Sequence, residues 1–87
     1  MRLNIKAWAL SWGLLWGGGL LAVGLLNLVW AGYGQSFLAA MASIYPGYHA
    51  TPSIIEVVVV TLYGFVDGLI GGAVFGWLYN RLAGSAS

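Results

Sequence analysis

The feature that most limits the fold of this chain is a pair of long apolar runs. The run from Ala7 to Trp30 has 24 residues and no charged side chain. As a helix it would be roughly 36 Å long at about 1.5 Å per residue, enough to cross a hydrocarbon core of about 30 Å with some tilt. The run from Ile54 to Tyr79 has 26 residues and carries two acids, Glu56 near its start and Asp67 near its middle. The two runs predict an all-α membrane protein whose two transmembrane helices form an antiparallel hairpin.

Composition supports this fold class. Of the 87 residues, 61% are hydrophobic and 6% are charged, whereas soluble domains have about 25% charged residues. A chain of this length is too short to bury so much apolar surface in a core of its own. We therefore expect one membrane unit over residues 1–87, with the lipid bilayer as its surroundings.

Charge and residue types exclude several classes of function. The net charge of +1 is too small for nucleic-acid binding, which needs a basic patch. The sequence has no cysteine and one histidine, so we expect no disulfide, no metal site and no cofactor. It also lacks a nucleophile–base pair and a phosphate-binding loop, and we do not expect an enzyme.

The start of the chain has an alternative interpretation as a signal peptide, because Arg2 and Lys6 precede the first apolar run. The apolar region of a signal peptide is about 7–15 residues long and ends at a small-x-small cleavage site. The first run is longer, and no such site follows Trp30. We therefore favour a transmembrane helix over about residues 7–30.

The connection over residues 31–53 is punctuated by glycine and proline, which favour turns. Within it, residues 35–45 have apolar side chains at helical spacing. These side chains are Phe37, Leu38, Met41, Ile44 and Tyr45. A helix of about 10 residues is too short to cross a membrane, so we expect an amphipathic helix at the membrane surface. An irregular re-entrant loop is the alternative.

The second run has recognisable boundaries. Ser53 and Glu56 have the spacing of a capping box, in which their side chains satisfy free N–H groups of the first helical turn. Thr51 followed by Pro52 is an alternative start. Asn80, Arg81 and Gly84 mark the expected exit from a transmembrane helix over about residues 54–79, followed by a frayed tail over residues 82–87.

The basic residues predict the orientation of the hairpin. Arg2, Lys6 and Arg81 all flank the same side, and the connection has no Lys or Arg. The positive-inside rule then places both termini in the cytoplasm and the loop over residues 31–53 on the outer side.

Four glycines in the second run recur at every fourth position. They are Gly64, Gly68, Gly72 and Gly76. On a helix this spacing makes a groove without side chains, where another helix can approach closely. Ala9, Gly13 and Gly17 have the same spacing in the first run, so the simplest pairing lies within the hairpin. Because the ladder drifts around the helix, Gly71 and Asp67 would then face a second helix, from another copy or another membrane-protein subunit.

Asp67 is the only ionisable residue in the middle of either run. A charged side chain at that depth costs at least about 2.5–3.5 kcal/mol. Aligning the centres of the two runs puts Asp67 opposite residues 17–19, which are glycines, and leaves Tyr63 as the only polar side chain nearby. We expect Asp67 to be protonated, to bind exposed backbone, or to bind another chain. Its role is then a hydrogen bond between helices, with proton or ion conduction as the alternative.

Three further features have two interpretations each. Glu56 shares a helix face with Asp67, which would suit an ion path, but the cap explains it. Trp8, Trp12 and Trp16 form a stripe that either faces lipid or docks a pigment, quinone or partner helix. His49 is expected to be solvated or locally hydrogen-bonded, because the spans offer no second histidine for a haem or chlorophyll site.

Several strings of the sequence resemble a known family. They are Leu3-Asn4-Ile5-Lys6-Ala7, Ile44-Tyr45-Pro46-Gly47-Tyr48, Tyr63-Gly64-Phe65-Val66-Asp67-Gly68 and Trp77-Leu78-Tyr79-Asn80. The chain resembles, over nearly its whole length, small bacterial two-span proteins described as bacteriophage holin or holin-like. The resemblance implies a non-enzymatic protein that forms homo-oligomers in the bacterial inner (cytoplasmic) membrane and permeabilises it.

Two other functions are compatible with the sequence. The first is an accessory structural subunit of a larger bacterial membrane complex, respiratory or photosynthetic, because a nearly uncharged loop and a glycine groove suit burial among other helices. The second is a small proton or ion conductor that uses Asp67.

Overall fold

The computed structural model describes residues 3–85, and over these residues the chain forms three helices and no strand. The helices are α1 (Ile5–Val29), α2 (Gln35–Ile44) and α3 (Ile54–Ser85). Both α1 and α3 are long and apolar enough to cross a membrane, by length and composition. The prediction of an all-α chain with two long apolar helices is therefore confirmed. Arg2, one of the basic residues that predict the orientation, lies outside the described residues.

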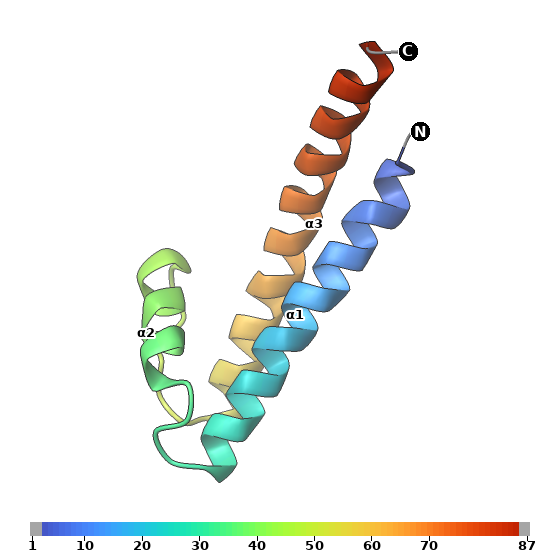
Figure 1. Ribbon diagram of the computed structural model, residues 1–87. Coiled ribbons are helices and arrows are strands. Elements are labelled where there is room, and N and C mark those ends of the chain that lie inside the picture. Colours follow the sequence, from blue (N-terminus) through green and yellow to red (C-terminus); the bar gives the residue numbers. More distant parts are fainter. Residues whose placement is uncertain (1–2, 86–87) are drawn as a thin grey trace.

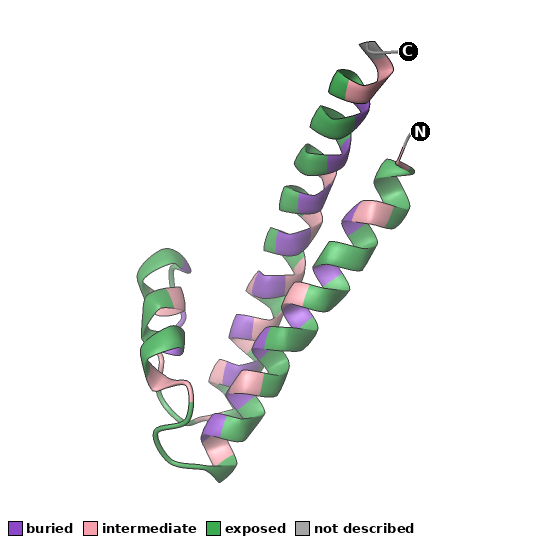
Figure 2. Ribbon diagram, viewed as in Figure 1, coloured by how far each residue is buried: buried purple, intermediate pink, exposed green. Residues whose placement is uncertain are grey.

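The two long helices lie side by side and run in opposite directions, so both ends of the chain are at the same end of the molecule (Figure 1). The molecule is elongated, with principal extents of 52 × 20 × 18 Å. Burial is confined to the strip where α1 and α3 meet and to the side that α2 covers (Figure 2). Leu20 of α1 and Val60 of α3 are the most deeply buried large side chains among the described residues.

Local sequence accounts for most helix ends. The side chain of Asn4 accepts a hydrogen bond from the Ala7 N–H at 3.1 Å and caps α1. Gly34 and Gly47 have φ angles of +65° and +84°, at the start of α2 and just after its end. Glycine adopts this left-handed region without steric cost, so these positions suit sharp turns.

The far end of α3 differs from the expectation. The helix continues to Ser85 and does not end near Tyr79. No proline follows to stop it, and Asn80 is held from outside the helix. The Leu3 N–H donates to Asn80 Oδ1 at 2.6 Å, and Asn80 Nδ2 donates to the Leu3 carbonyl oxygen at 2.7 Å. Asn80 is 8% exposed, and its two bonds fasten the start of the described chain to α3.

We expect Asn80→Leu to release the segment before α1. The change leaves the Leu3 N–H and carbonyl without partners, which costs about 1–3 kcal/mol. Asn80→Asp separates the two bonds, because it keeps the acceptor for the Leu3 N–H and replaces the donor to the Leu3 carbonyl with a carboxylate oxygen. Amide hydrogen exchange over residues 3–8 measures both. Equal exchange in Asn80→Leu and the native chain would contradict the fastening role.

α2 does not lie across the end of the α1–α3 pair, where a helix at the membrane surface was expected. It runs back along α1 and α3, so that its C-terminal end reaches about the middle of the pair (Figure 1). Residues 45–53, the return segment, then lead back to the start of α3. Side chains from α1, α2, α3 and the return segment share one core, which contains Leu20, Leu38, Tyr45, Tyr48 and Val60. The short helix expected over about residues 35–45 is thus present as α2, and it packs along the α1–α3 pair.

Candidate functional site

The four-residue glycine ladder of α3 faces α1 along its whole length. A Cβ placed on Gly64 would lie 3.2 Å from the Cα of Gly17, and one on Gly68 would lie 2.8 Å from the Cα of Gly13. Farther along, a Cβ on Gly72 would lie 3.0 Å from the Cα of Ala9. Gly76 lies against Trp8 and Ile5 at the end of α1. The two backbones therefore approach each other closely because side chains are missing from both sides.

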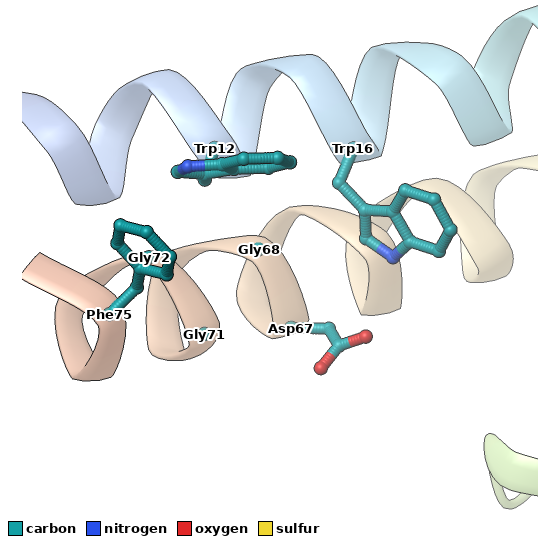
Figure 3. Close-up of a pocket in the computed structure, with 7 residues that line it drawn as sticks. All are labelled: Trp12, Trp16, Asp67, Gly68, Gly71, Gly72 and Phe75. Atoms are coloured by element: carbon teal, nitrogen blue, oxygen red, sulfur yellow. The ribbon is translucent and has the colours of Figure 1, made fainter.

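Gly71 differs from the ladder glycines. A Cβ on Gly71 would meet no atom within 4 Å, and Gly71 is exposed. The ladder is used within the chain, whereas Gly71 and the neighbouring Asp67 face away from α1 (Figure 3). Gly71 and Asp67 thus lie on a surface that α1 leaves open, whereas the ladder glycines do not.

Asp67 has a side-chain partner that the sequence did not predict. The Tyr45 hydroxyl donates to Asp67 Oδ2 at 2.8 Å, and Trp16 Nε1 donates to the same hydroxyl oxygen at 3.1 Å. The expectation that only Tyr63 would be near Asp67 is wrong, because it assumed that the helix before Tyr45 lies at the membrane surface. The three side chains come from α1, the end of α2 and α3, and they join all three helices in one hydrogen-bonded chain.

Tyr63 holds the backbone of the return segment. Its hydroxyl donates to the Pro46 carbonyl oxygen, and its ring stacks on the Tyr45 ring with centroids 4.8 Å apart and planes 1° apart. Tyr63 and Asp67 lie one helical turn apart on α3. Asp67 binds Tyr45 and Tyr63 binds Pro46, which are consecutive residues of the turn after α2. These two contacts fix the position of that turn along α3.

Asp67 also borders a groove on the surface of the α1–α3 pair. The groove has a volume of about 300 Å³. We call it the Asp67 groove, and its lining residues are Trp12, Trp16, Asp67, Gly68, Gly71, Gly72 and Phe75. Figure 3 shows the carboxylate turned away from α1, with the two indoles above it and the glycines forming a floor without side chains. At the end near Phe75, the wall continues into Trp8, whose ring stacks on Phe75.

Glu56 fastens the middle of the return segment. Its carboxylate accepts from the His49 N–H at 2.9 Å and lies 3.3 Å from His49 Nδ1. The Ser53 carbonyl accepts from the Val57 N–H at 3.0 Å, as expected of a residue that precedes α3. The described residues show no hydrogen bond of the Ser53 side chain, so the expected capping box is not formed. Glu56 binds the return segment instead. Glu56 and Asp67 each bind a different part of that segment and do not form a line of free acids.

A second polar group ties the connection to α1. Asn27 is buried, and its Nδ2 donates to the Tyr33 carbonyl at 2.8 Å and to Gln35 Oε1 at 3.2 Å. Gln35 Nε2 in turn donates to the Ala50 carbonyl at 2.7 Å. Sequence reasoning assigned no role to Asn27 or Gln35. Polar amides placed within or next to apolar runs are the signal that could have found them, because a buried amide needs partners.

The chemistry available in this arrangement is limited to hydrogen bonding, aromatic contact and one exposed carboxylate. Among residues 3–85, no group of three metal-ligating side chains comes together. Comparison with known proteins finds no matching family model, no matching curated protein and no matching solved structure.

Proposed function

We propose that this chain is a small, non-enzymatic integral membrane protein of the holin-like kind, which self-associates in the bacterial inner membrane. In this proposal α1 and α3 span the bilayer as a hairpin with both termini in the cytoplasm. Residues 31–53 enter from the outer side as a re-entrant segment. The glycines and Ala9 along the α1–α3 contact suit helix packing in lipid, where close backbone approach replaces the hydrophobic effect.

Exposed apolar side chains support insertion into a bilayer. Leu14, Leu15 and Ile55 are 66%, 67% and 70% exposed. In the most apolar window of each long helix, only 28% of the residues are buried. A core helix of a soluble domain would bury most of such a window, so these faces favour contact with lipid.

The observation that carries the self-association is the free backbone of the return segment. Gly47 is exposed, and neither its N–H nor its carbonyl makes a hydrogen bond within residues 3–85. The carbonyl of the neighbouring Pro46 accepts a hydrogen bond from Tyr63. Tyr63 lies seven residues after Glu56 on α3, which is about 10 Å along the helix. With Glu56 and His49 at the outer interface, Gly47 lies about 10 Å inside the hydrocarbon region. Irregular backbone is tolerated at such a depth only against protein or a water-filled cavity.

A second copy of this chain is the cover that we propose for Gly47. The interface then lies around the turn after α2, and not on the glycine ladder, which faces α1 in the structure. The sequence instead predicted a further helix at Gly71 and Asp67, on the Gly-rich side of the second run. The Asp67 groove favours a second candidate, in which a different membrane protein covers the same side and the chain is an accessory subunit.

Native mass spectrometry of the protein extracted from its own membrane separates the two candidates. We expect a homo-oligomer. A complex with other proteins would favour the accessory subunit, and a monomer in mild detergent would contradict both. Regulated expression in a bacterial host tests the holin-like activity separately. Growth arrest with dye leakage is expected, and their absence would remove permeabilisation from the proposal.

Disulfide cross-linking locates the interface, because the native chain has no cysteine. Ile44, next to the turn, is 63% exposed, and Val74, in the half of α3 far from α2, is 57% exposed. We expect Ile44→Cys to form a cross-linked dimer in membranes under oxidising conditions. Val74→Cys is the matched control and should remain largely monomeric. Equal cross-linking of the two variants would contradict an interface at the turn.

A further inference from the structure

We propose that the Asp67 groove is a binding site for a lipophilic organic cation, such as an aryl-substituted ammonium or phosphonium ion. Nothing in the proposed self-association requires this site, because the interface argued above lies at Gly47 and the groove lies farther along the α1–α3 pair. The inference rests on three observations: an incompletely paired carboxylate, a wall of aromatic rings and a floor without side chains.

The carboxylate is only partly satisfied by the protein. Asp67 Oδ2 accepts from the Tyr45 hydroxyl, and Asp67 makes no other hydrogen bond within residues 3–85. Asp67 is exposed, and its carboxylate points away from α1 on the open side of the groove (Figure 3). A charge in that position is expensive in lipid unless a counter-charge accompanies it.

Among residues 3–85, no cationic side chain lies at the depth of Asp67. Gly68 packs on Gly13, so Asp67 is level with about Leu14 of α1. Lys6 is then about 12 Å away along α1, and Arg81 is about 21 Å away along α3. The Arg81 guanidinium lies over the Trp77 ring, 5.7 Å from its centroid.

His49 does not supply a cation either, since it pairs with Glu56, which lies about 16 Å from Asp67 along α3. A second copy of the chain would bring the same neutral side chains to the groove. Packed against a second copy, Asp67 would therefore lack a counter-charge. This favours a cationic ligand over a neutral helix as the occupant.

The groove walls suit the apolar body of such a cation. Trp12 and Trp16 lie one helical turn apart on α1, Trp12 is 40% exposed, and Phe75 closes one end. The face of an indole ring attracts a cation that lies within about 6 Å of its centre. Because Gly68, Gly71 and Gly72 carry no side chains, the floor lies at the level of the α3 backbone. The volume of about 300 Å³ is at the lower end of the range for small-molecule sites, which is about 300–1,000 Å³.

Titration with tetraphenylphosphonium tests the site, with the full-length protein in lipid nanodiscs and isothermal titration calorimetry as the readout. We expect saturable binding that the neutral compound triphenylphosphine oxide does not reproduce. Asp67→Asn should lower the affinity about tenfold or more, because it removes the charge of the carboxylate. Glu56→Gln is the matched control, since Glu56 lies outside the groove, and it should bind like the native chain.

Two further measurements keep the result interpretable. The side-chain amide introduced by Asp67→Asn still has an oxygen that can accept from Tyr45, so this variant should fold, and near-ultraviolet circular dichroism of the tryptophans checks this. Gly71→Leu fills the groove and leaves the carboxylate in place, and it should abolish binding. Equal affinity of native protein and Asp67→Asn, or equal binding of the neutral compound, would overturn the proposal. Absence of saturable binding to the native protein would overturn it as well.

Discussion

Gly68→Ala is expected to weaken the contact between α1 and α3 by about 1–3 kcal/mol, the usual cost of overpacking a tight site. A Cβ on Gly68 would meet the Trp12 carbonyl oxygen and lie 2.8 Å from the Cα of Gly13. Both neighbours are backbone atoms, so neither can rotate away as a flexible side chain would. The loss opposes a gain of up to about 1 kcal/mol from the higher helix propensity of alanine, and the clash should exceed that gain.

Gly71→Ala is the matched control, because it adds the same methyl group to the same helix where no atom lies within 4 Å. We expect it to be neutral or stabilising by up to about 1 kcal/mol. Detergent denaturation followed by energy transfer between labels on α1 and α3 compares the two variants. If Gly68→Ala were as stable as Gly71→Ala, the close backbone approach at Gly68 would not be a determinant of the fold.

Tyr45→Phe is expected to loosen the return segment by about 2–6 kcal/mol. The change removes the donor to Asp67 and the acceptor for Trp16 while keeping the ring that stacks on Tyr63. Each partner left without a hydrogen bond in an apolar setting costs about 1–3 kcal/mol. Hydrogen exchange of the amides over residues 44–52 should therefore become faster.

Tyr33→Phe provides the control for Tyr45→Phe. The Tyr33 ring stacks on Trp30, but within residues 3–85 its hydroxyl makes no hydrogen bond. Its removal should leave the exchange rates over residues 44–52 unchanged. Tyr63→Phe loses only the bond to the Pro46 carbonyl and should fall between the two. Unchanged exchange in Tyr45→Phe would mean that apolar packing alone holds the segment.

The helices could be predicted from sequence because their signals are local. The apolar runs and the turn glycines lie in the elements that they define, and the expected starts of α2 and α3 agree with the structure. The end of α3 could not be found this way. Asn80 looks like an exit signal in the sequence, but it binds Leu3 at the other end of the described chain, and only the paired helices bring those two residues together.

The environment of Asp67 could not be predicted for a related reason. Aligning the centres of the two runs placed Asp67 opposite Gly18 of α1. In the structure the helices pair through glycine contacts, and Asp67 lies about one turn away, opposite Leu14. Its partner Tyr45 depends on the direction of α2, which no local pattern specifies. Amphipathic spacing fits a helix on a membrane surface and a helix packed against the α1–α3 pair equally well.

The glycine ladder has a consequence for the alignment of α1 and α3. A ladder with equal steps fits its partner in more than one place, and a slip of four residues, about 6 Å along the axis, would again set small residues against small residues. Apolar contact alone therefore leaves the register degenerate. Such a slip would break both the Asn80–Leu3 bonds and the Asp67–Tyr45 bond. The hydrogen bonds of a few polar side chains thus select one register of α1 against α3.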